Sequence, residues 1–266
     1  MTYKQALEYK AKEDWDNYFL CLIKSKLKKA NKELNFFNQK CDWKTKINFS
    51  KILPTIEKLV DKNNPGSQHL LGYMYQHGEG VEKDYEKAIH YYTLSANQGN
   101  SSAQYNLGNM YYFGQGVKKD YEKAIHYYTL SVNQENSVAQ NNLGYMYKYG
   151  TGVEQDYEKA IHYYTLSANQ GNSSAQNNLG NMYYSGQCVE QNYEKAIHYY
   201  TLSVNQGNSV ASKNLEEIPK IKRIKYENKE LRKENEELKT HIMAMPDGDL
   251  YFEAKKHYHD QVSTIK

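Results

Sequence analysis

Four histidines recur at a fixed spacing in the middle of the chain, and repeated imidazoles are residues that could bind a metal ion. His90, His126, His162 and His198 are each separated by 36 residues. Each of them falls two residues after an alanine that we expect to face the core, which places its side chain on the outer side of its helix. An intervening helix should separate equivalent helices, so the imidazoles are too far apart to share an ion. We therefore expect no metal site and no cofactor.

The three cysteines give no catalytic or structural pattern either. Cys21, Cys41 and Cys188 are odd in number, widely spaced and without a paired C-x-x-C, which favours neither a disulfide framework nor a zinc cage. No neighbouring base activates Cys188, so we expect an inert loop thiol. Catalysis needs different groups that converge at one place, and this chain repeats the same groups. The sequence argues against an enzyme and against a small-molecule substrate.

Composition and charge exclude further classes of function. The chain has 266 residues, with 34 Lys and Arg against 31 Asp and Glu and a net charge of +3. Such a small charge gives no strong field, so nucleic acid is an unfavoured partner. The longest apolar run near the start covers residues 18–23, far below the roughly 20 residues that span a bilayer, and it lacks a signal-peptide pattern. We expect an intracellular protein without a membrane partner.

A 36-residue repeat organises the middle of the chain. The dipeptide Leu-Gly occurs at residues 71, 107, 143 and 179, each 36 residues after the last. The stretches 101–136 and 173–208 differ at only seven of 36 positions. A fixed period of this length is typical of helical solenoids.

Each repeat is predicted to form two helices. In residues 101–136 the first apolar stripe comprises Ala103, Leu107, Met110 and Tyr111, and the second comprises Ala124, Ile125, Tyr128 and Val132. This spacing is that of amphipathic helices, the first about 13 residues long. Asp120 is the expected N-cap of the second helix. Gly108 follows the core leucine, where a glycine costs about 1 kcal/mol in helix propensity, so we expect it to permit close helix packing.

At these residues the chain resembles the Sel-one-like repeat family, relatives of the tetratricopeptide repeats. The family pattern is approximately A-x-x-x-L-G-x-x-Y-x-x-G-x-G-V-x-x-D-x-x-K-A-x-x-W-Y, and residues 139–164 match it with Tyr163 in place of the tryptophan. The resemblance covers about four and a half repeats, 65–218. It implies an all-α fold, a right-handed α-solenoid of antiparallel helix pairs. The departures from the pattern are Ser67, Glu135, Cys188 and Asn192, which suggest a strained or relaxed fourth loop.

The two flanks are predicted to be helical as well. Residues 1–64 should form an N-terminal cap, which could consist of degenerate repeats. After Pro219 the period changes to seven, which predicts a coiled-coil-like helix over 219–246 and a tail over 247–266. All four prolines should lie at helix starts or ends. The predicted heptad core comprises Ile221, Ile224, Asn228, Leu231, Asn235, Leu238 and Ile242.

This last helix has two interpretations. In a parallel homodimer, Glu227 would pair with Arg232 and Glu234 with Lys239 between copies, while the two core asparagines would set the register at a cost in stability. In the alternative, the helix folds back as a cap on the last repeat.

The likeness to tetratricopeptide repeats implies a concave groove on the first helices of the repeats. Asparagine amides there can donate to and accept from a peptide backbone, and tyrosines add rigid contact area. The groove positions are Tyr73, Gln76, Tyr105, Asn109, Tyr112, Asn141, Tyr145, Lys148, Asn177, Asn181 and Tyr184. The simpler interpretation is that these are solvated residues of a duplicated array.

The resulting expectation is a non-enzymatic scaffold that binds an unidentified protein through this groove. One alternative is a helical-repeat RNA-binding protein, which is less favoured because base-reading repeats vary their side chains and carry a basic track. Another is a structural, homo-oligomeric component. The residue usage resembles that of uncharacterised family members in giant DNA viruses of amoebae, for which the location would be the host cytoplasm.

Overall fold

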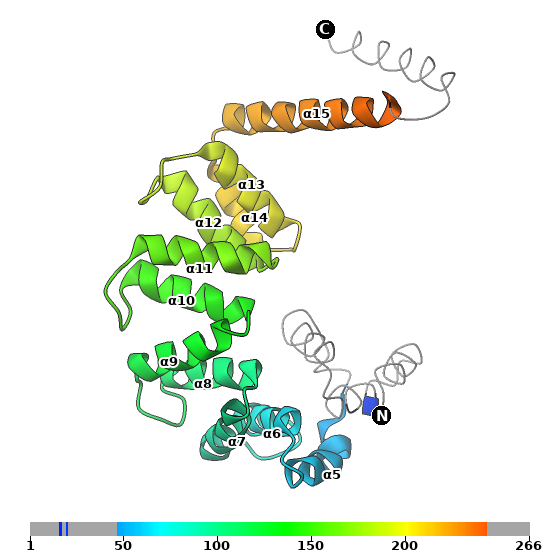
Figure 1. Cartoon of the computed structure of the whole chain (residues 1–266), viewed down its shortest axis with the longest axis vertical. Helices are drawn as coiled ribbons and strands as arrows, with labels where there is room; N and C mark the ends of the chain where they lie inside the picture. Colours follow the sequence, from blue (N-terminus) through cyan, green and yellow to red (C-terminus); the bar gives the residue numbers. More distant parts are fainter. Residues whose placement is uncertain (1–15, 18–19, 21–46, 244–266) are drawn as a thin grey trace. The chain divides into compact units, whose positions relative to one another are not determined.

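The computed structural model describes residues 16–17, 20 and 47–243, and all regular structure in that part of the chain is α-helical (Figure 1). The chain divides into two compact units, and the boundary in the sequence falls between Ala175 and Gln176. Most of the predicted N-terminal cap, Cys21, Cys41 and the tail over 247–266 lie outside the described residues.

Helix pairs follow one another along the chain, as Figure 1 shows. After α5 (Phe49–Val60), the pairs are α6 (Pro65–His77) with α7 (Tyr85–Asn97), α8 (Ser101–Phe113) with α9 (Tyr121–Val132), α10 (Ser137–Tyr149) with α11 (Tyr157–Asn169), and α12 (Ser173–Ser185) with α13 (Tyr193–Val204). The half-repeat α14 (Ser209–Glu217) and the long α15 (Lys220–Met243) complete the chain. The predicted all-α solenoid of repeated helix pairs is confirmed.

Polar side chains cap the helix starts, and Asp120 caps α9 as the sequence predicts. The Asp120 carboxylate accepts a hydrogen bond from the Lys123 amide at 2.9 Å at the start of α9, and the Asn100 side chain accepts from the Ala103 amide at 2.9 Å at the start of α8. Of the prolines predicted at helix starts or ends, Pro246 lies outside the described residues, and the prediction is wrong for Pro54, which lies inside α5. Its ring nitrogen cannot donate to the carbonyl four residues earlier, and packing of Ile52 and Ile56 in the core offsets that loss.

The glycine after each core leucine makes room for a tyrosine ring. A Cβ added to Gly108 would lie 2.5 Å from Cδ1 of Tyr128, and a Cβ on Gly144 would lie 2.7 Å from Cδ1 of Tyr164. The tyrosine rings at this position, Tyr92, Tyr128, Tyr164 and Tyr200, are among the largest fully buried side chains. The expected close packing is therefore confirmed, and burial of an aromatic ring compensates for the poor helix propensity of glycine.

Buried polar side chains tie the two helices of each repeat together, a feature that the apolar periodicity does not predict. The Ser131 hydroxyl donates to the Ser101 carbonyl at 2.8 Å, and the Gln134 amide donates to Oε1 of buried Gln104 at 2.7 Å. The same bonds recur in the third repeat, where Ser167 donates to the Ser137 carbonyl. Each bond joins residues 30 positions apart, so it fixes how the second helix lies against the first.

Two departures from the repeat pattern carry backbone strain. Cys188 has φ 57° and Glu135 has φ 62°, at positions where other repeats place glycines such as Gly152 (φ 71°) and Gly171 (φ 83°). The left-handed conformation costs a non-glycine residue roughly 1–2 kcal/mol. The fourth-repeat loop thus keeps the family backbone at an energetic cost.

The second unit ends in α14 and α15, which complete the core of the last repeat. Ala211 and Ile218 are buried against Ala196 and Tyr200, and Tyr226 of α15 packs at the edge of this cluster. Figure 1 shows α15 starting beside α13 and then continuing beyond it.

Candidate protein-binding surface

The predicted groove residues all lie on the first helices of the repeats, α6, α8, α10 and α12. The eight positions between Tyr73 and Lys148 belong to the first unit, and the three positions between Asn177 and Tyr184 belong to the second. Tyr73 is 9% exposed, and its ring packs 6.3 Å from that of Phe49 in α5. Asn177 is 8% exposed and accepts a hydrogen bond from Asn214 at 2.9 Å. These two side chains are therefore occupied within the fold.

Side-chain amides of asparagines join neighbouring repeats, and two of the predicted residues, Asn109 and Asn181, are acceptors in these bonds. Nδ2 of Asn106 is 3.0 Å from Nε2 of His69, and Nδ2 of Asn142 donates to Oδ1 of Asn109 at 3.4 Å. In the second unit, Nδ2 of Asn214 also donates to Oδ1 of Asn181 at 3.0 Å. The donors belong to a recurring asparagine that directly precedes the core leucine. Its 36-residue period was a visible signal that sequence reasoning missed.

The same asparagines also accept hydrogen bonds from the buried tyrosines. The Tyr128 hydroxyl donates to Oδ1 of Asn109 at 2.7 Å, and the Tyr200 hydroxyl donates to Oδ1 of Asn181 at 2.7 Å. In the first repeat, the Tyr92 hydroxyl donates to Oε1 of Gln76, again at 2.7 Å. Asn109, Asn181 and Gln76 therefore support the fold, because each satisfies a phenol that would otherwise be buried without a partner.

The third repeat lacks this acceptor. Tyr145 occupies the position of Asn109, and the buried Tyr164 hydroxyl has no hydrogen-bond partner among the described residues. Burial is the main cause that raises the pKa of Tyr164, and the nearby phenols of Tyr149 and Tyr145 raise it further. The third repeat therefore contains a buried, unpaired hydroxyl at the position where the second and fourth repeats have a hydrogen-bonded one.

Phenylalanine substitutions should distinguish these two environments. Tyr164→Phe removes an unsatisfied buried hydroxyl and is expected to stabilise the protein by about 1 kcal/mol, whereas Tyr128→Phe removes a hydrogen bond and should destabilise it by about 1 kcal/mol. Urea unfolding followed by circular dichroism measures both free energies. Tyr200→Phe is the matched control and should behave like Tyr128→Phe. Equal destabilisation by all three substitutions would contradict the assignment of Tyr164 as unpaired.

An exposed aromatic cluster lies at the C-terminal ends of α8 and α10. Phe113 is 60% exposed, Tyr149 is 55% exposed and Tyr145 is 43% exposed. The ring centroids of Tyr112 and Phe113 are 4.8 Å apart, and those of Tyr145 and Tyr149 are 4.5 Å apart. The two pairs lie on helices that a hydrogen bond from Asn142 to Asn109 joins, and the pKa of Tyr112 is raised by burial and then by Tyr145. We call the four residues of the two ring pairs the aromatic cluster.

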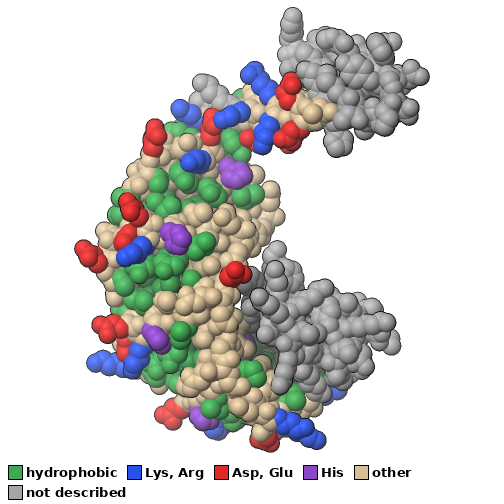
Figure 2. All heavy atoms as spheres, in the orientation of Figure 1, with side chains coloured by type: hydrophobic (Ala, Val, Ile, Leu, Met, Phe, Trp, Pro, Cys, Tyr) green, Lys and Arg blue, Asp and Glu red, His purple; other side chains and the backbone are tan. Residues whose placement is uncertain are grey.

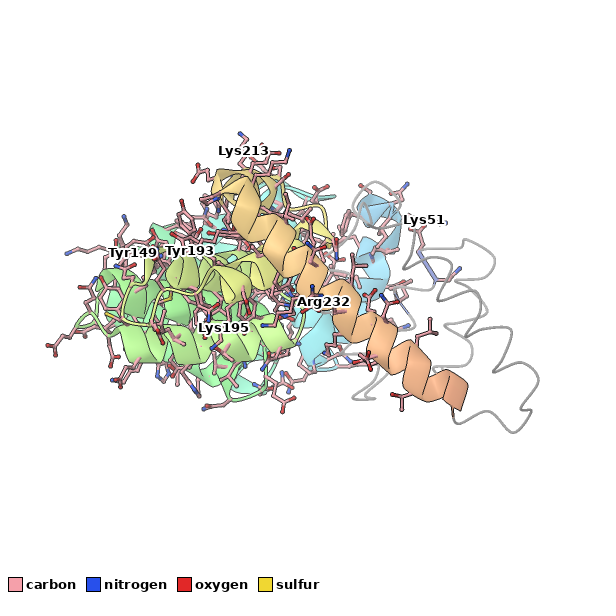
Figure 3. The ribbon with its side chains drawn as sticks, turned by 90° about the horizontal axis from the view of Figure 1, so that it is seen from above. Lys51, Tyr149, Tyr193, Lys195, Lys213 and Arg232 are labelled. Atoms are coloured by element: carbon pink, nitrogen blue, oxygen red, sulfur yellow. The ribbon has the colours of Figure 1, made fainter. Side chains whose placement is uncertain are left out.

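Lys148 belongs to the same surface. Its ammonium lies 5.1 Å from the centroid of the Tyr149 ring, and its backbone carbonyl accepts a hydrogen bond from Gln155 at 2.7 Å. The cluster therefore combines apolar ring faces, phenol hydroxyls and one positive charge. Figure 3 marks Tyr149.

The second helices of the repeats carry the recurring histidines. His126 lies edge-on against Tyr127, with ring centroids 5.3 Å apart, and Tyr127 stacks on Tyr111 at 5.7 Å. Lys123 adds its ammonium 5.2 Å from the centroid of the Tyr111 ring and pairs with Asp120 at 3.4 Å. The same ring arrangement recurs around His90, His162 and His198. Figure 2 shows histidines recurring among hydrophobic side chains on one face.

No helix in the described residues combines the length and the hydropathy needed to cross a lipid bilayer. Within the same residues, no three His, Cys, Asp or Glu side chains lie close enough together to hold a metal ion.

Comparison with known proteins supports the repeat assignment. A Sel1-like repeat-containing protein of Acanthamoeba polyphaga mimivirus is 35% identical over 85 residues, which is 32% of this chain and 14% of that protein. A Sel1 repeat protein from Oxalobacter formigenes has a similar structure, with a TM-score of 0.65 and 25% identity over 87% of this chain and 99% of that one. A protective antigen of uropathogenic Escherichia coli with the same fold gives a TM-score of 0.62 at 23% identity, over 98% and 64% of the two chains.

The family model places the repeats directly on the helix pairs. The Sel1 repeat model matches residues 65–100, 101–136, 137–172 and 173–208, which together exceed half of the chain. Proteins with this repeat are generally scaffolds for protein interactions and are typically not enzymes. The period, the helix pairs and the family match agree, and the chain belongs to the Sel1 repeat family.

Proposed function

We propose that this chain is a non-enzymatic scaffold that binds a segment of another protein on the surface formed by α8 and α10. The observation that supports the proposal is the aromatic cluster, in which Phe113, Tyr145 and Tyr149 are exposed and Tyr112 is half-buried. Large exposed aromatic groups are uncommon on a surface without a partner, and tyrosine and other aromatic residues are enriched at the centres of protein interfaces.

The cluster is specific to two repeats. The positions equivalent to Phe113 and Tyr149 are His77 in the first repeat and Ser185 in the fourth. Because the fold-supporting residues recur in nearly every repeat and these rings do not, the rings are not a general requirement of the solenoid. A binding role accounts for their concentration on α8 and α10.

The chemistry of the surface favours a protein segment with an apolar anchor. The ring faces of Phe113 and Tyr149 would cover a leucine, proline or aromatic side chain, and Lys148 would attract an acidic neighbour. Asn109 uses its Oδ1 within the fold, but its Nδ2 donates to no residue in the described chain and can donate to a peptide carbonyl. The buried Tyr164 hydroxyl, which has no hydrogen-bond partner among the described residues, is a second donor that becomes available if the side chains covering it move.

Peptide selection tests this proposal. Peptides of random sequence are displayed and selected on the full chain, and the dissociation constants of the selected peptides are measured by fluorescence anisotropy. The double substitution Phe113→Ala/Tyr149→Ala is expected to weaken binding at least tenfold, because anchoring aromatic residues contribute roughly 2 kcal/mol or more. Both side chains are more than half exposed, so the variant should fold normally.

A matched control uses exposed leucines on the second helices. Leu166→Ala/Leu202→Ala removes two apolar side chains that are 37% and 36% exposed, and should leave the affinity unchanged. Selected peptides that bind the Phe113/Tyr149 variant as tightly as the unaltered chain would overturn the proposal. A single-stranded RNA oligonucleotide that bound more tightly than any peptide, through the same rings, would instead establish the RNA-binding alternative.

A further inference from the structure

The two sides of α15 have different environments. Three residues on one side contact α13: the Lys222 ammonium lies 5.2 Å from the centroid of the Tyr193 ring, the Tyr226 hydroxyl is 3.4 Å from Nδ1 of His198, and Lys229 pairs with Glu194. Residues spaced by four and three positions share one side of a helix. This side of α15 caps the last repeat.

Ile221 and Ile242 lie outside the residues whose side chains the structure describes, and the other heptad residues lie on the opposite side of α15 and are exposed. Ile224 is 44% exposed, Leu231 is 55% exposed and Leu238 is 59% exposed. With 3.6 residues per turn, Leu231 lies about 180° around the helix from Lys222. The capping and heptad residues therefore do not compete, and the two interpretations of this helix are compatible with each other.

We propose that the exposed side of α15, formed by Ile224, Asn228, Leu231, Asn235 and Leu238, binds the same side of α15 in a second copy of the chain and makes a parallel homodimer. Leucines repeated every seven residues, with a polar residue between them, are typical of the core of a two-stranded coiled coil. This inference stands independently of the proposed peptide-binding function.

The charged residues beside the heptad core favour a second copy of the chain as the partner that binds the exposed side of α15. Glu227 and Arg232 flank this side, both exposed, and neither pairs with a charged residue elsewhere in the described chain. Five positions separate them, so they are not neighbours on one helix. In a parallel dimer each Glu227 faces Arg232 of the other copy, which gives two attractive pairs for each dimer. Figure 3 shows Arg232 on α15, at a distance from Tyr193 and Lys195 of α13.

The two asparagines set the strength and the register of this interface. An asparagine in a coiled-coil core lowers affinity and specifies a unique alignment, because only one register pairs its amides. Asn228 and Asn235 are seven residues apart, and both are exposed in the single chain. We therefore expect a weak dimer, with a dissociation constant on the order of 10 µM. Each dimer would present two aromatic clusters and would bind a divalent partner with increased avidity.

Sedimentation equilibrium of the full chain over a range of concentrations tests this inference. We expect a monomer–dimer equilibrium that Leu231→Asp/Leu238→Asp abolishes, while circular dichroism stays unchanged because both leucines are exposed. Asn228→Ile/Asn235→Ile should tighten the dimer at least tenfold. A gain in affinity of this kind cannot result from damage to the fold. Lys233→Asp, on the side of α15 opposite the heptad residues, is the control and should leave the equilibrium unchanged.

A charge swap tests the parallel arrangement. Arg232→Glu should weaken the dimer, because it replaces attraction with repulsion, and Glu227→Arg/Arg232→Glu should restore it with the original amino-acid composition. A chain that stays monomeric at several hundred micromolar and does not dimerise after the isoleucine substitutions would overturn the inference. A dimer whose dissociation constant is unchanged by Leu231→Asp/Leu238→Asp would also overturn it. Failure of the charge swap to restore the dimer would exclude the parallel arrangement.

Discussion

Alanine at Gly152 is expected to destabilise the protein by roughly 3–5 kcal/mol, one of the largest effects available from one added methyl group. Gly152 has φ 71°, and a Cβ there would lie closer than 3.0 Å to Cβ of Tyr121 in the preceding repeat. The Cβ of Tyr121 belongs to the first turn of α9 and cannot move without shifting that helix. The clash therefore adds to the cost of the left-handed backbone.

A second glycine separates the two contributions. Gly171 has φ 83° and no atom within 4 Å of an added Cβ, so Gly171→Ala should cost only the backbone strain, about 1 kcal/mol. Urea unfolding of both variants measures the difference, which reports the packing between two successive repeats. If Gly152→Ala costs no more than Gly171→Ala, the close approach of this loop to Tyr121 is not maintained in solution.

Acid is expected to destabilise the first repeat through His69, by about 3 kcal/mol between pH 7 and pH 4. Burial lowers the pKa of His69 to about 4, from an ordinary value of 6.5. Its Nε2 lies 3.0 Å from the Asn106 amide nitrogen, a donor that requires the neutral imidazole as acceptor. Between pH 6.5 and 4 the unfolded chain binds a proton that the folded chain does not. Stability is therefore complete above pH 6.5 and falls until about pH 4.

Asparagine at position 69 provides the control for this pH dependence. Asn141 and Asn177 occupy the equivalent position in the third and fourth repeats, so His69→Asn fits the fold and still offers Asn106 an acceptor oxygen. Urea unfolding at pH 7 and pH 4 should show a loss in the unaltered chain that exceeds the loss in the variant by about 3 kcal/mol. Parallel curves for the two proteins would show that the proton on His69 does not control stability.

The sequence predicts the local structure of this protein well. The 36-residue period, the helices of about 13 residues and the capping residue Asp120 are all found in the structure. These features depend on interactions within one helix turn or on the side of the helix that a residue occupies. Both follow from spacing along the chain, because a helix converts sequence separation directly into direction.

The candidate site depends more on the tertiary structure. Spacing places Asn109, Tyr145 and Asn181 at equivalent positions of their helices, yet two of them support buried tyrosines and one is exposed. The difference arises from contacts with residues 19 to 33 positions away, such as Tyr128 and Asn142. A single-helix pattern contains no information on those contacts.

By itself, then, the sequence determined the repeat, its helices and the family of the fold, because each is encoded in a short, periodic set of residues. Only the tertiary structure decided which polar residues serve the fold and which aromatic rings remain exposed. It also decided that the capping and heptad sides of α15 are separate. The physical reason is that the exposure of a side chain depends on which residues of neighbouring helices contact it. Those contacts form only when distant parts of the chain pack together.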